Sequence, residues 1–495
     1  MNTPTTSPLV PFSDPGHLRA PYAEAVLDHA GRDWLRLNVP GHAAARGSAL
    51  EECFGPRVLE LDFPPLLDGI DLGSDTPLDK ALALAAGAWG ARRTWFLTNG
   101  ASQGNHIASM VAPALGRTLV VQRSVHSSVV DGLVLSGLDA VFVQPSVDPR
   151  QGIAHGVTAK DVAEALDRTP DAAAVYIVSP SYFGAVADVR AIADAAHAAG
   201  VPLIVDEAWG SHFGFHPGLP AGALRFGADL VTSSTHKLAG SLTQSAMLHL
   251  GHGPFADLLE PLVDRAFRLV QSTSASALLT ASLDLARRAL VIDADRIGGS
   301  IEAADKVRGV IRTLGRFKVV SDGFDAFPDI TRADPLRIAI DTRAGGITGH
   351  EARRLLFRDH QIMVEVATDA AIVAVIGAGR APDIDRFIEA LHCLPSPLTG
   401  SAAGQAVLRL PAPGPARLTA REAFLSPAQV VPAAEAVGRI SADTLAAYPP
   451  GIPNVLPGEV ITAETVRFLQ RTATAPNGHV RGALDAGVTR LRVVA

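Results

Sequence analysis

A lysine at position 237 lies in the stretch Val231-Thr-Ser-Ser-Thr-His-Lys-Leu-Ala-Gly240, directly after hydroxyl residues and a histidine. Small and hydroxyl-bearing neighbours allow close approach to an anion, and a lysine whose charge is suppressed can attack a carbonyl carbon. The combination suggests a Schiff base with the aldehyde of pyridoxal phosphate. The same run would also fit a solvated turn with a surface lysine, so other stretches must decide between the two.

Three further stretches carry the remaining groups that this cofactor needs, namely a carboxylate for the pyridine nitrogen, donors for the phosphate and a flat side chain over the ring. Asp206 follows an apolar strand and is the candidate carboxylate. Gly100, Ala101 and Ser102 open a helix after another strand, where unpaired backbone N–H groups point at an anion. His126 is the candidate for ring stacking. Each would alternatively fit a capping aspartate, an ordinary capped turn or a hydrogen-bonded, partly buried histidine.

Short apolar segments that alternate with helical stretches must position these groups, and they predict a mostly parallel sheet with helices on both faces. Ligand sites on such sheets lie at the carboxyl ends of the strands. Every candidate above comes just after a predicted strand. The strands are expected at residues 94–97, 118–122, 140–143, 174–178, 202–205, 230–232 and 246–250.

The chain is predicted to contain four parts. Residues 1–55 form an N-terminal arm, whose helix at 21–30 packs either on a partner subunit or on its own large domain, and residues 56–310 form that large domain. A smaller α/β domain covers 311–400, and a linker with a C-terminal domain covers 401–495. Expected strands of the third part are 317–321, 336–340, 362–366 and 371–375, with helices at 348–358 and 381–394; the fourth part has helices at 427–437 and 463–474.

Composition limits the partners. A chain of 495 residues with 47% hydrophobic and 19% charged residues can fill two or three globular domains. Its net charge of −7 provides no basic field for nucleic acid. Cys53 and Cys393 form neither a disulfide framework nor a zinc site, and no metal site is expected. No signal peptide or membrane span is evident, so a cytoplasmic protein is predicted.

Several motifs together resemble the Orn/Lys/Arg decarboxylase family: Ser233-Ser-Thr-His-Lys-Leu238, Val205-Asp-Glu-Ala-Trp-Gly-Ser-His212, Thr98-Asn-Gly-Ala-Ser-Gln-Gly-Asn105, Val39-Pro-Gly-His42, and Tyr448-Pro-Pro-Gly-Ile-Pro453 with Pro457-Gly-Glu459. The resemblance spans about residues 35–490 and looks like the short form without an N-terminal wing domain. It implies an aspartate aminotransferase-like fold (fold type I), pyridoxal phosphate as cofactor, and α-decarboxylation of arginine, lysine or ornithine, as in polyamine biosynthesis. It further implies a homodimer with shared active sites.

The resemblance also implies roles for individual residues. Lys237, His236, Asp206 and His126 would form the catalytic set, and the cofactor would in addition contact Ala101, Ser102, Ala208, Trp209, Ser234 and, from the second subunit, Thr273 in Gln271-Ser-Thr-Ser274. Three positions depart from the family pattern. Ser127 replaces a lysine, Ala101 replaces a threonine and Ala43 replaces a lysine.

Alternatives remain open at this stage. An aminotransferase or another fold type I lyase would use a small-domain arginine as a carboxylate clamp, for which Arg337 and Arg343 are available. A non-catalytic amine or cofactor sensor would not require the complete lysine, aspartate and histidine set. For the group that binds the distal cation of the substrate, Glu459 is the first candidate, followed by Asp75 and Glu365.

Overall fold

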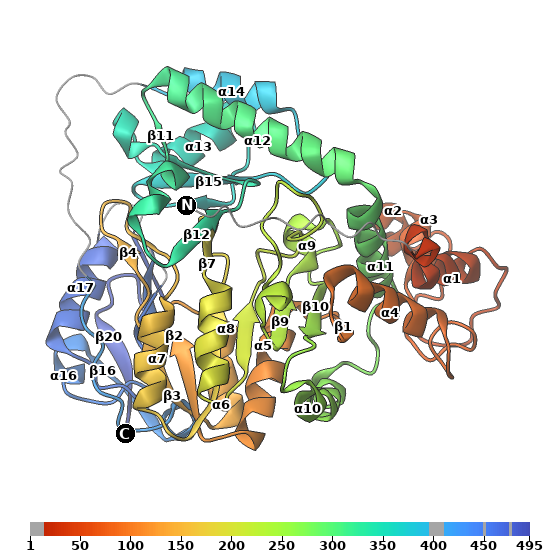
Figure 1. Cartoon of the computed structure of the whole chain (residues 1–495). Coiled ribbons are helices and arrows are strands. Elements are labelled where there is room, and N and C mark those ends of the chain that lie inside the picture. Colours follow the sequence, from red (N-terminus) through yellow and green to blue (C-terminus); the bar gives the residue numbers. More distant parts are fainter. Residues whose placement is uncertain (1–13, 396–409, 449–451, 475–477) are drawn as a thin grey trace. The chain divides into compact units, whose positions relative to one another are not determined.

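The computed structural model describes residues 14–395, 410–448, 452–474 and 478–495 (Figure 1). The chain divides into two compact units. The first comprises Met1–Ile107, Glu207–Gly299 and Gly377–Arg380, and the second comprises Ala108–Asp206, Ser300–Ile376 and Ala381–Ala495. Among the described residues, no helix is long and apolar enough to cross a bilayer.

In the first unit three strands pair in the order β1 (Arg93–Leu97), β10 (Ala246–Leu250) and β9 (Leu230–Ser233). The connection from β9 to β10 contains a single short helix. Strand β10 runs antiparallel to both neighbours, with Trp95 opposite Leu248 and Leu248 opposite Thr232. Consequently β1 and β9 point the same way, and their carboxyl ends lie at the same edge.

Helices of the first unit begin and end at recognisable signals. Helix α4 (Pro77–Trp89) opens with a capping box between Thr76 and Asp79 and ends at Gly90, which has a left-handed conformation. The other helices are α1 (Pro21–Ala30), α2 (Ala49–Phe54), α3 (Pro56–Leu61), α5 (Gly100–Val111), α9 (Thr235–Leu238), α10 (Ala256–Val270) and α11 (Ala277–Ile292).

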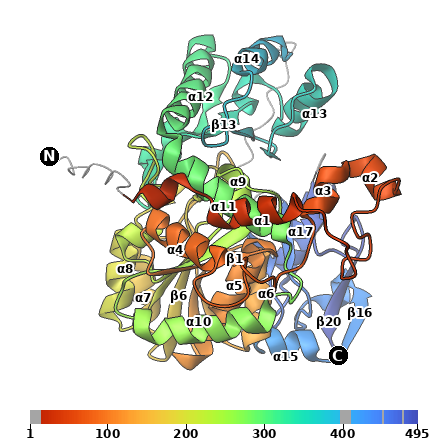
Figure 2. The ribbon, with the colours of Figure 1, turned by 90° about the vertical axis from the view of Figure 1, so that its right-hand side faces the viewer.

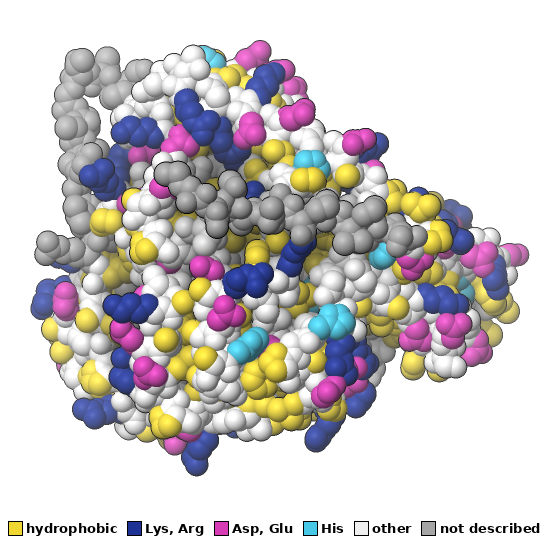
Figure 3. Space-filling model, in the orientation of Figure 1, with side chains coloured by type: hydrophobic (Ala, Val, Ile, Leu, Met, Phe, Trp, Pro, Cys, Tyr) yellow, Lys and Arg dark blue, Asp and Glu magenta, His cyan; other side chains and the backbone are white. Residues whose placement is uncertain are grey.

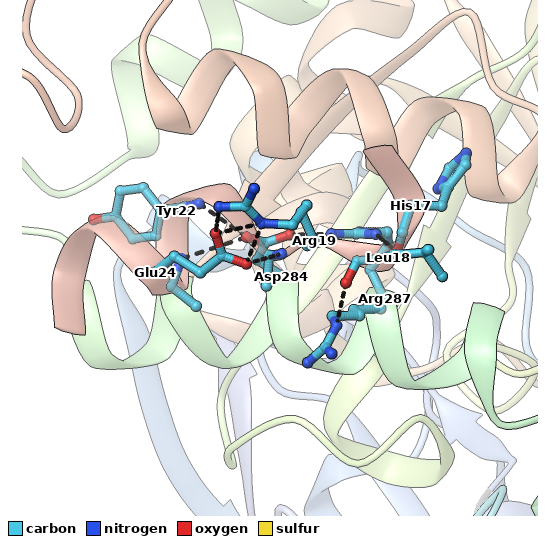
Figure 4. A network of polar contacts seen from close by, with 10 residues as sticks. His17, Leu18, Arg19, Tyr22, Glu24, Asp284 and Arg287 are labelled. Atoms are coloured by element: carbon cyan, nitrogen blue, oxygen red, sulfur yellow. Dashed lines mark hydrogen bonds and ion pairs between the residues drawn. The ribbon is translucent and has the colours of Figure 1, made fainter. Parts of the chain in front are cut away.

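The N-terminal arm packs on its own unit through α1, which lies along α11 (Figures 1 and 4). The fully buried Asp284 of α11 accepts hydrogen bonds from the backbone N–H groups of Tyr22 (3.0 Å) and Ala23 (3.4 Å), at the start of α1. Arg287 pairs with Asp284 at 2.7 Å and donates to the carbonyl of His17 at 2.9 Å. Of the two predicted packing partners for this helix, the structure therefore shows its own unit.

In the second unit four strands form a parallel sheet in the order β8 (Leu203–Asp206), β6 (Ala172–Val178), β2 (Thr118–Gln122) and β3 (Asp139–Val143). Nearly all residues of β2, β6 and β8 are buried, as expected for parallel strands covered on both faces. Helices α7 (Ala159–Asp167) and α8 (Val189–Ala198) pack together, and α6 (Ser127–Ser136) packs against α15 (Ala420–Leu425). The large-domain strands expected from the sequence are all present.

A second sheet in this unit has the order β11 (Lys318–Val319), β13 (Arg337–Asp341), β15 (Ala371–Val375) and β14 (Val366–Ala367). Helices α12 (Ala294–Leu314), α13 (Gly349–His360) and α14 (Ile384–Cys393) accompany it (Figure 2). Two predicted strands were largely wrong. The segment 317–321 turns into a 3-10 helix at Val320–Ala326, whose Ser-Asp-Gly sequence favours turns, and most of 362–366 has no ladder partner.

The C-terminal part builds a core of its own from α16 (Ala433–Ala436), α17 (Ala463–Thr474) and two small sheets, β16 (Ala428–Pro432) with β20 (Arg490–Val494), and β18 (Pro453–Val455), β17 (Leu445–Tyr448) and β19 (His479–Arg481). The helix predicted at 427–437 was only partly right, because Ala428–Pro432 form β16 and the helix α16 covers only Ala433–Ala436. Two prolines and a β-branched pair favour an edge strand there. The predicted helix at 463–474 is confirmed.

Short pairs that the sequence did not indicate are β4 (Val147–Asp148) with β5 (Ile153–Ala154), and β7 (Ala185–Ala187) with β12 (Ile330–Ala333). On the face shown in Figure 3, basic and acidic side chains are interspersed. That pattern agrees with the mixed charge along the sequence.

Candidate active site

Lys237 lies in α9, directly after β9, in the first unit. Its ammonium nitrogen is 4.0 Å from the ring centroid of Trp209, a distance typical of a cation–π contact. Trp209 is 7% exposed and Ala208 beside it is also buried. The structure thus brings together Lys237 and the two residues that the Asp-Glu-Ala-Trp motif placed at the cofactor.

His236 precedes this lysine, and its Nδ1 is 2.9 Å from the carbonyl oxygen of Ser245. Since a carbonyl oxygen can only accept, Nδ1 carries the proton in the neutral ring and Nε2 is the basic nitrogen. The loop that contains Ser245 therefore fixes the orientation and the tautomer of His236.

The predicted phosphate turn is held by the same loop. The backbone N–H of Gly100 donates to the carbonyl of Gln244 at 2.7 Å, and the Gln244 amide donates to Asn99 at 3.0 Å. Gly100 has φ +69°, which favours glycine at this sharp entry into α5. Because adjacent residues of one loop bind His236 and Gly100, the helix start at Ala101 and Ser102 lies next to the segment that carries Lys237.

Two glutamines that lie in quoted segments, but to which no role was assigned from sequence, complete this region. The Gln103 amide donates to Gln271 at 2.6 Å, and Gln271 donates to Thr98 at 3.3 Å. Gln271 therefore contacts the phosphate turn of its own subunit, whereas Thr273 is exposed. The reach of Thr273 into a second subunit stays a prediction. The only sequence signal for Gln103 was its place inside the quoted Thr98–Asn105 motif.

Close packing of α5 on the strands leaves room only for glycine at position 104. A Cβ there would lie 2.7 Å from the Thr232 side chain and 3.1 Å from Leu97. Ser234, the other predicted phosphate contact, is buried at the end of β9. This tight contact keeps the start of α5 and the end of β9 in fixed register.

Asp206 and His126 lie in the second unit. Asp206 is the last residue of β8 and pairs in register with Val178 of β6, while its carbonyl accepts from the N–H of Ser179 at 3.1 Å. His126 follows β2 and caps α6, with Nδ1 2.8 Å from the Ser128 hydroxyl and 3.2 Å from the Ser128 N–H. Both therefore stand at the carboxyl edge of the parallel sheet, as predicted.

Glu207, next to Asp206 in sequence, is a buried acid that sequence reasoning did not consider. Burial raises the pKa of Glu207 to about 8, opposed only by the hydrogen bond from the Ala223 N–H, which is 2.8 Å long. The carboxyl group is thus protonated at neutral pH. It ties the Asp-Glu-Ala-Trp segment to the loop at residues 222–223.

Glu459 is paired within the second unit. Its carboxylate forms a two-pronged ion pair with the buried Arg123, one contact being 2.8 Å between Nη2 and Oε2, and it also accepts from the Leu456 N–H at 2.9 Å. Arg123 in turn donates to the carbonyl of Pro453 at 3.1 Å. This arrangement satisfies the carboxylate internally and gives Glu459 a structural role in attaching the C-terminal part.

The remaining candidates are the two arginines considered as a carboxylate clamp and the two acids considered for the distal cation of the substrate. Arg337 is fully buried, donates to the carbonyl of Tyr182 at 2.6 Å, and has its pKa lowered to about 10 by burial. Arg343 is half-buried and donates to the carbonyl of Arg150. Asp75 is exposed and pairs with Lys80 at 3.1 Å, and Glu365 is exposed. Both arginines already donate to backbone carbonyls of the chain.

Comparison with known proteins agrees with these motifs. The model of the Orn/Lys/Arg decarboxylase major domain matches residues 20–326, and that of the C-terminal domain matches residues 406–478. The chain belongs to the Orn/Lys/Arg decarboxylase family. The arginine decarboxylase of Bacillus subtilis (strain 168) is 32% identical over 481 residues, covering 96% of this chain and 97% of that protein.

Solved structures show the fold. The lysine decarboxylase of Francisella novicida superimposes with a TM-score of 0.79 at 20% identity and covers 97% of this chain and 82% of that one. SPT with a pyridoxal phosphate internal aldimine has a TM-score of 0.51 at 15% identity, covering 76% and 85%. The fold is therefore aspartate aminotransferase-like, as predicted, and the protein is a pyridoxal phosphate-dependent amino acid decarboxylase. The aminotransferase and sensor alternatives are set aside.

The residues present fit this cofactor. A helix start with a left-handed glycine offers backbone donors for a phosphate, and a lysine packed on a buried tryptophan stands beside it. A carboxylate and an imidazole stand at the carboxyl edge of the parallel strands. The loss of the usual threonine hydroxyl at Ala101 leaves the backbone N–H in place.

Proposed function

We propose that this protein removes the α-carboxylate of arginine and releases the corresponding amine and carbon dioxide. The observation that carries the choice of arginine is the whole-length match to an arginine decarboxylase, 32% identical over 96% of the chain. Pyridoxal phosphate, when bound, supplies the electron sink for the bond that breaks. Binding, orientation and proton movement are the tasks of the residues below.

Lys237 is the residue that holds the cofactor aldehyde and returns a proton to the α-carbon. The contact of its ammonium group with the Trp209 ring supports this role because the ring positions Nζ at the strand end. His236 acts beside it as a positioning residue. The hydrogen bond from Nδ1 to the Ser245 carbonyl holds the His236 ring in place, and Lys237 is the proton donor.

Asp206 holds the pyridine nitrogen in its protonated form, and His126 covers the ring face. Pairing of Asp206 with β6 keeps the carboxylate at the strand end, and the hydrogen bonds to Ser128 restrict rotation of the His126 ring. Ala101 and Ser102 bind the phosphate through the start of α5. Two protomers share their sites in a homodimer, with Thr273 of each protomer reaching the phosphate of the other.

The substrate assignment is tested by incubating purified protein and pyridoxal phosphate with a panel of amino acids and measuring carbon dioxide release. Arginine should be decarboxylated at least about a hundredfold faster than citrulline or norleucine, because a site built for a cation leaves its own groups unpaired with a neutral analogue. A neutral amino acid as the best substrate would overturn the proposal. Lysine or ornithine as the best substrate would overturn the choice of arginine alone.

The assembly is tested by sedimentation at assay concentration. The smallest active species should be a dimer. Thr273→Ala should weaken cofactor binding in both sites while the dimer stays intact. A monomer that is active would show that Thr273 does not contribute to the site of a second protomer.

A further inference from the structure

A cavity of about 300 Å³ lies within the second unit, at the carboxyl ends of β2 and β6. His126, Val178 and Ser181 line it from the sheet side, and Thr368, Thr444 and Arg481 line it from the later parts of the chain. Since Val178 pairs with Asp206 across the strands, the cavity lies next to both residues proposed to hold the cofactor ring. Its volume is at the small end of the range for ligand pockets.

His155 is the unusual group in the wall of this cavity. Its side chain is 2% exposed, yet neither ring nitrogen has a hydrogen-bond partner among the described residues. Phe327 and Phe324 pack against the ring with centroids 4.5 and 5.4 Å away. A buried polar side chain without a partner is costly, and a ligand in the cavity would satisfy it.

The strand ends hold His155 in place. Gln122 at the end of β2 donates to the carbonyl of His155 at 3.2 Å and accepts from the N–H of Val178 at 3.1 Å. The backbone N–H of His155 donates to Ser146 at 2.8 Å. The ring is therefore presented to the cavity by a fixed backbone.

The charges around the cavity favour a cationic ligand. Asp131 of α6 lines it with a carboxylate that is exposed to solvent. Behind His155, the buried Asp329 accepts from the Gly156 N–H at 2.7 Å through one oxygen, and its other oxygen has no partner in the described residues. Burial lowers the pKa of His155, opposed by Asp329 and Asp148, so the ring is neutral and can accept a hydrogen bond.

Among the described residues that line the cavity, Arg481 is the only arginine, and it already donates to the Ser127 hydroxyl at 2.8 Å. An anion in the cavity would face the Asp131 carboxylate, and an apolar ligand would leave the His155 nitrogens unpaired. A guanidinium or ammonium group satisfies both the imidazole and the carboxylate.

We propose that this cavity receives the side chain of the basic substrate, with His155 accepting a hydrogen bond from the distal cation and Asp131 supplying the ionised counter-charge. The inference rests on the proposed function and assigns to these two residues the specificity role that the sequence had assigned to Glu459. Glu459 is neutralised by Arg123. His155 lies in none of the recognised motifs.

The test uses n-butylguanidinium, which mimics the arginine side chain and lacks the α-amine that reacts with the cofactor. The neutral n-butylurea is the matched probe. Calorimetry on the cofactor-loaded protein should give a Kd for n-butylguanidinium about 10- to 100-fold higher in Asp131→Asn and in His155→Leu, as expected for loss of a hydrogen bond to a charged group. His155→Gln should restore part of the affinity because its amide oxygen can accept.

Two controls separate binding from folding. Binding of n-butylurea should change less than about twofold in each variant, and Asp194→Asn, an exposed carboxylate of α8, should leave the n-butylguanidinium Kd unchanged. His155→Leu should not destabilise the protein, since its ring nitrogens have no partner to lose. KM for arginine should rise with the Kd while kcat changes little.

The outcomes distinguish this inference from the proposed function. If Asp131→Asn and His155→Leu leave the n-butylguanidinium Kd within about twofold of wild type, the cavity is not the side-chain pocket, even if arginine is decarboxylated. If the variants lose affinity and no basic amino acid releases carbon dioxide, the cation site stands and the proposed reaction does not.

Discussion

Replacing Glu207 by glutamine tests whether a neutral buried acid supports the active-site segment. The carboxyl group is buried and accepts one hydrogen bond, from Ala223 at 2.8 Å. Burial raises its pKa from 4.5 to about 8, a difference of 3.5 pH units. At about 1.36 kcal/mol per unit, ionising this group in the folded protein costs about 5 kcal/mol.

The direction of the pH dependence of stability follows from which state, folded or unfolded, binds the Glu207 proton. Between pH 4.5 and about 8 the folded protein keeps the Glu207 proton and the unfolded chain has lost it. The free energy of unfolding therefore falls as the pH rises through this window. The contribution of Glu207 is complete below pH 4.5 and lost above about 8. Glutamine resembles the protonated acid and does not titrate, so the variant should lack this slope.

Urea denaturation at several pH values measures the effect. From about pH 5.5 to 7.5, wild type should lose about 1.4 kcal/mol per pH unit relative to Glu207→Gln. Glu302→Gln, an exposed glutamate on α12, is the matched control and should run parallel to wild type. Infrared difference spectra should show a carboxylic acid band at neutral pH that Glu207→Gln lacks. A constant stability difference with no such band would refute a protonated Glu207.

Other substitutions test the site and its support. Lys237→Ala should lose the absorption band of covalently held cofactor, and a band that survives dialysis and borohydride treatment would assign another lysine. Asp206→Asn should fold and bind cofactor but lose turnover by several orders of magnitude, because a neutral amide does not stabilise the protonated pyridine; near-normal turnover would exclude Asp206. Asp284→Asn should lower the free energy of unfolding by about 3–5 kcal/mol, since it leaves the buried Arg287 without its counter-charge. Glu24→Gln, which removes the exposed ion pair with Arg19, should lower the free energy of unfolding by at most about 1 kcal/mol. If urea denaturation gave equal losses for Asp284→Asn and Glu24→Gln, the buried ion pair would not be what stabilises the α1–α11 contact.

Much of the fold could be read from the sequence because local patterns determined it. The buried strands β2, β6 and β8 are short apolar runs that end in polar residues, so both their positions and the edge that carries Asp206 and His126 were predictable. The extent of small strands such as β11 and β14 could not be predicted, because it depends on ladder partners that are distant in the sequence. The antiparallel direction of β10 was likewise not indicated.

Within the candidate site, residue types pointed to Lys237 and Asp206 because their chemistry is specific and their motifs are continuous. Tertiary structure alone decided the rest. Glu459 looked available in sequence, but folding places Arg123, 336 positions away, against its carboxylate. His155 lies in none of the quoted motifs, and Glu207 lies in one but was given no role there. The properties of both arise from burial, which depends on contacts between distant segments. The sequence by itself determined which chemical groups stand at the strand ends, and packing determined which of them are neutral, paired or left facing a cavity.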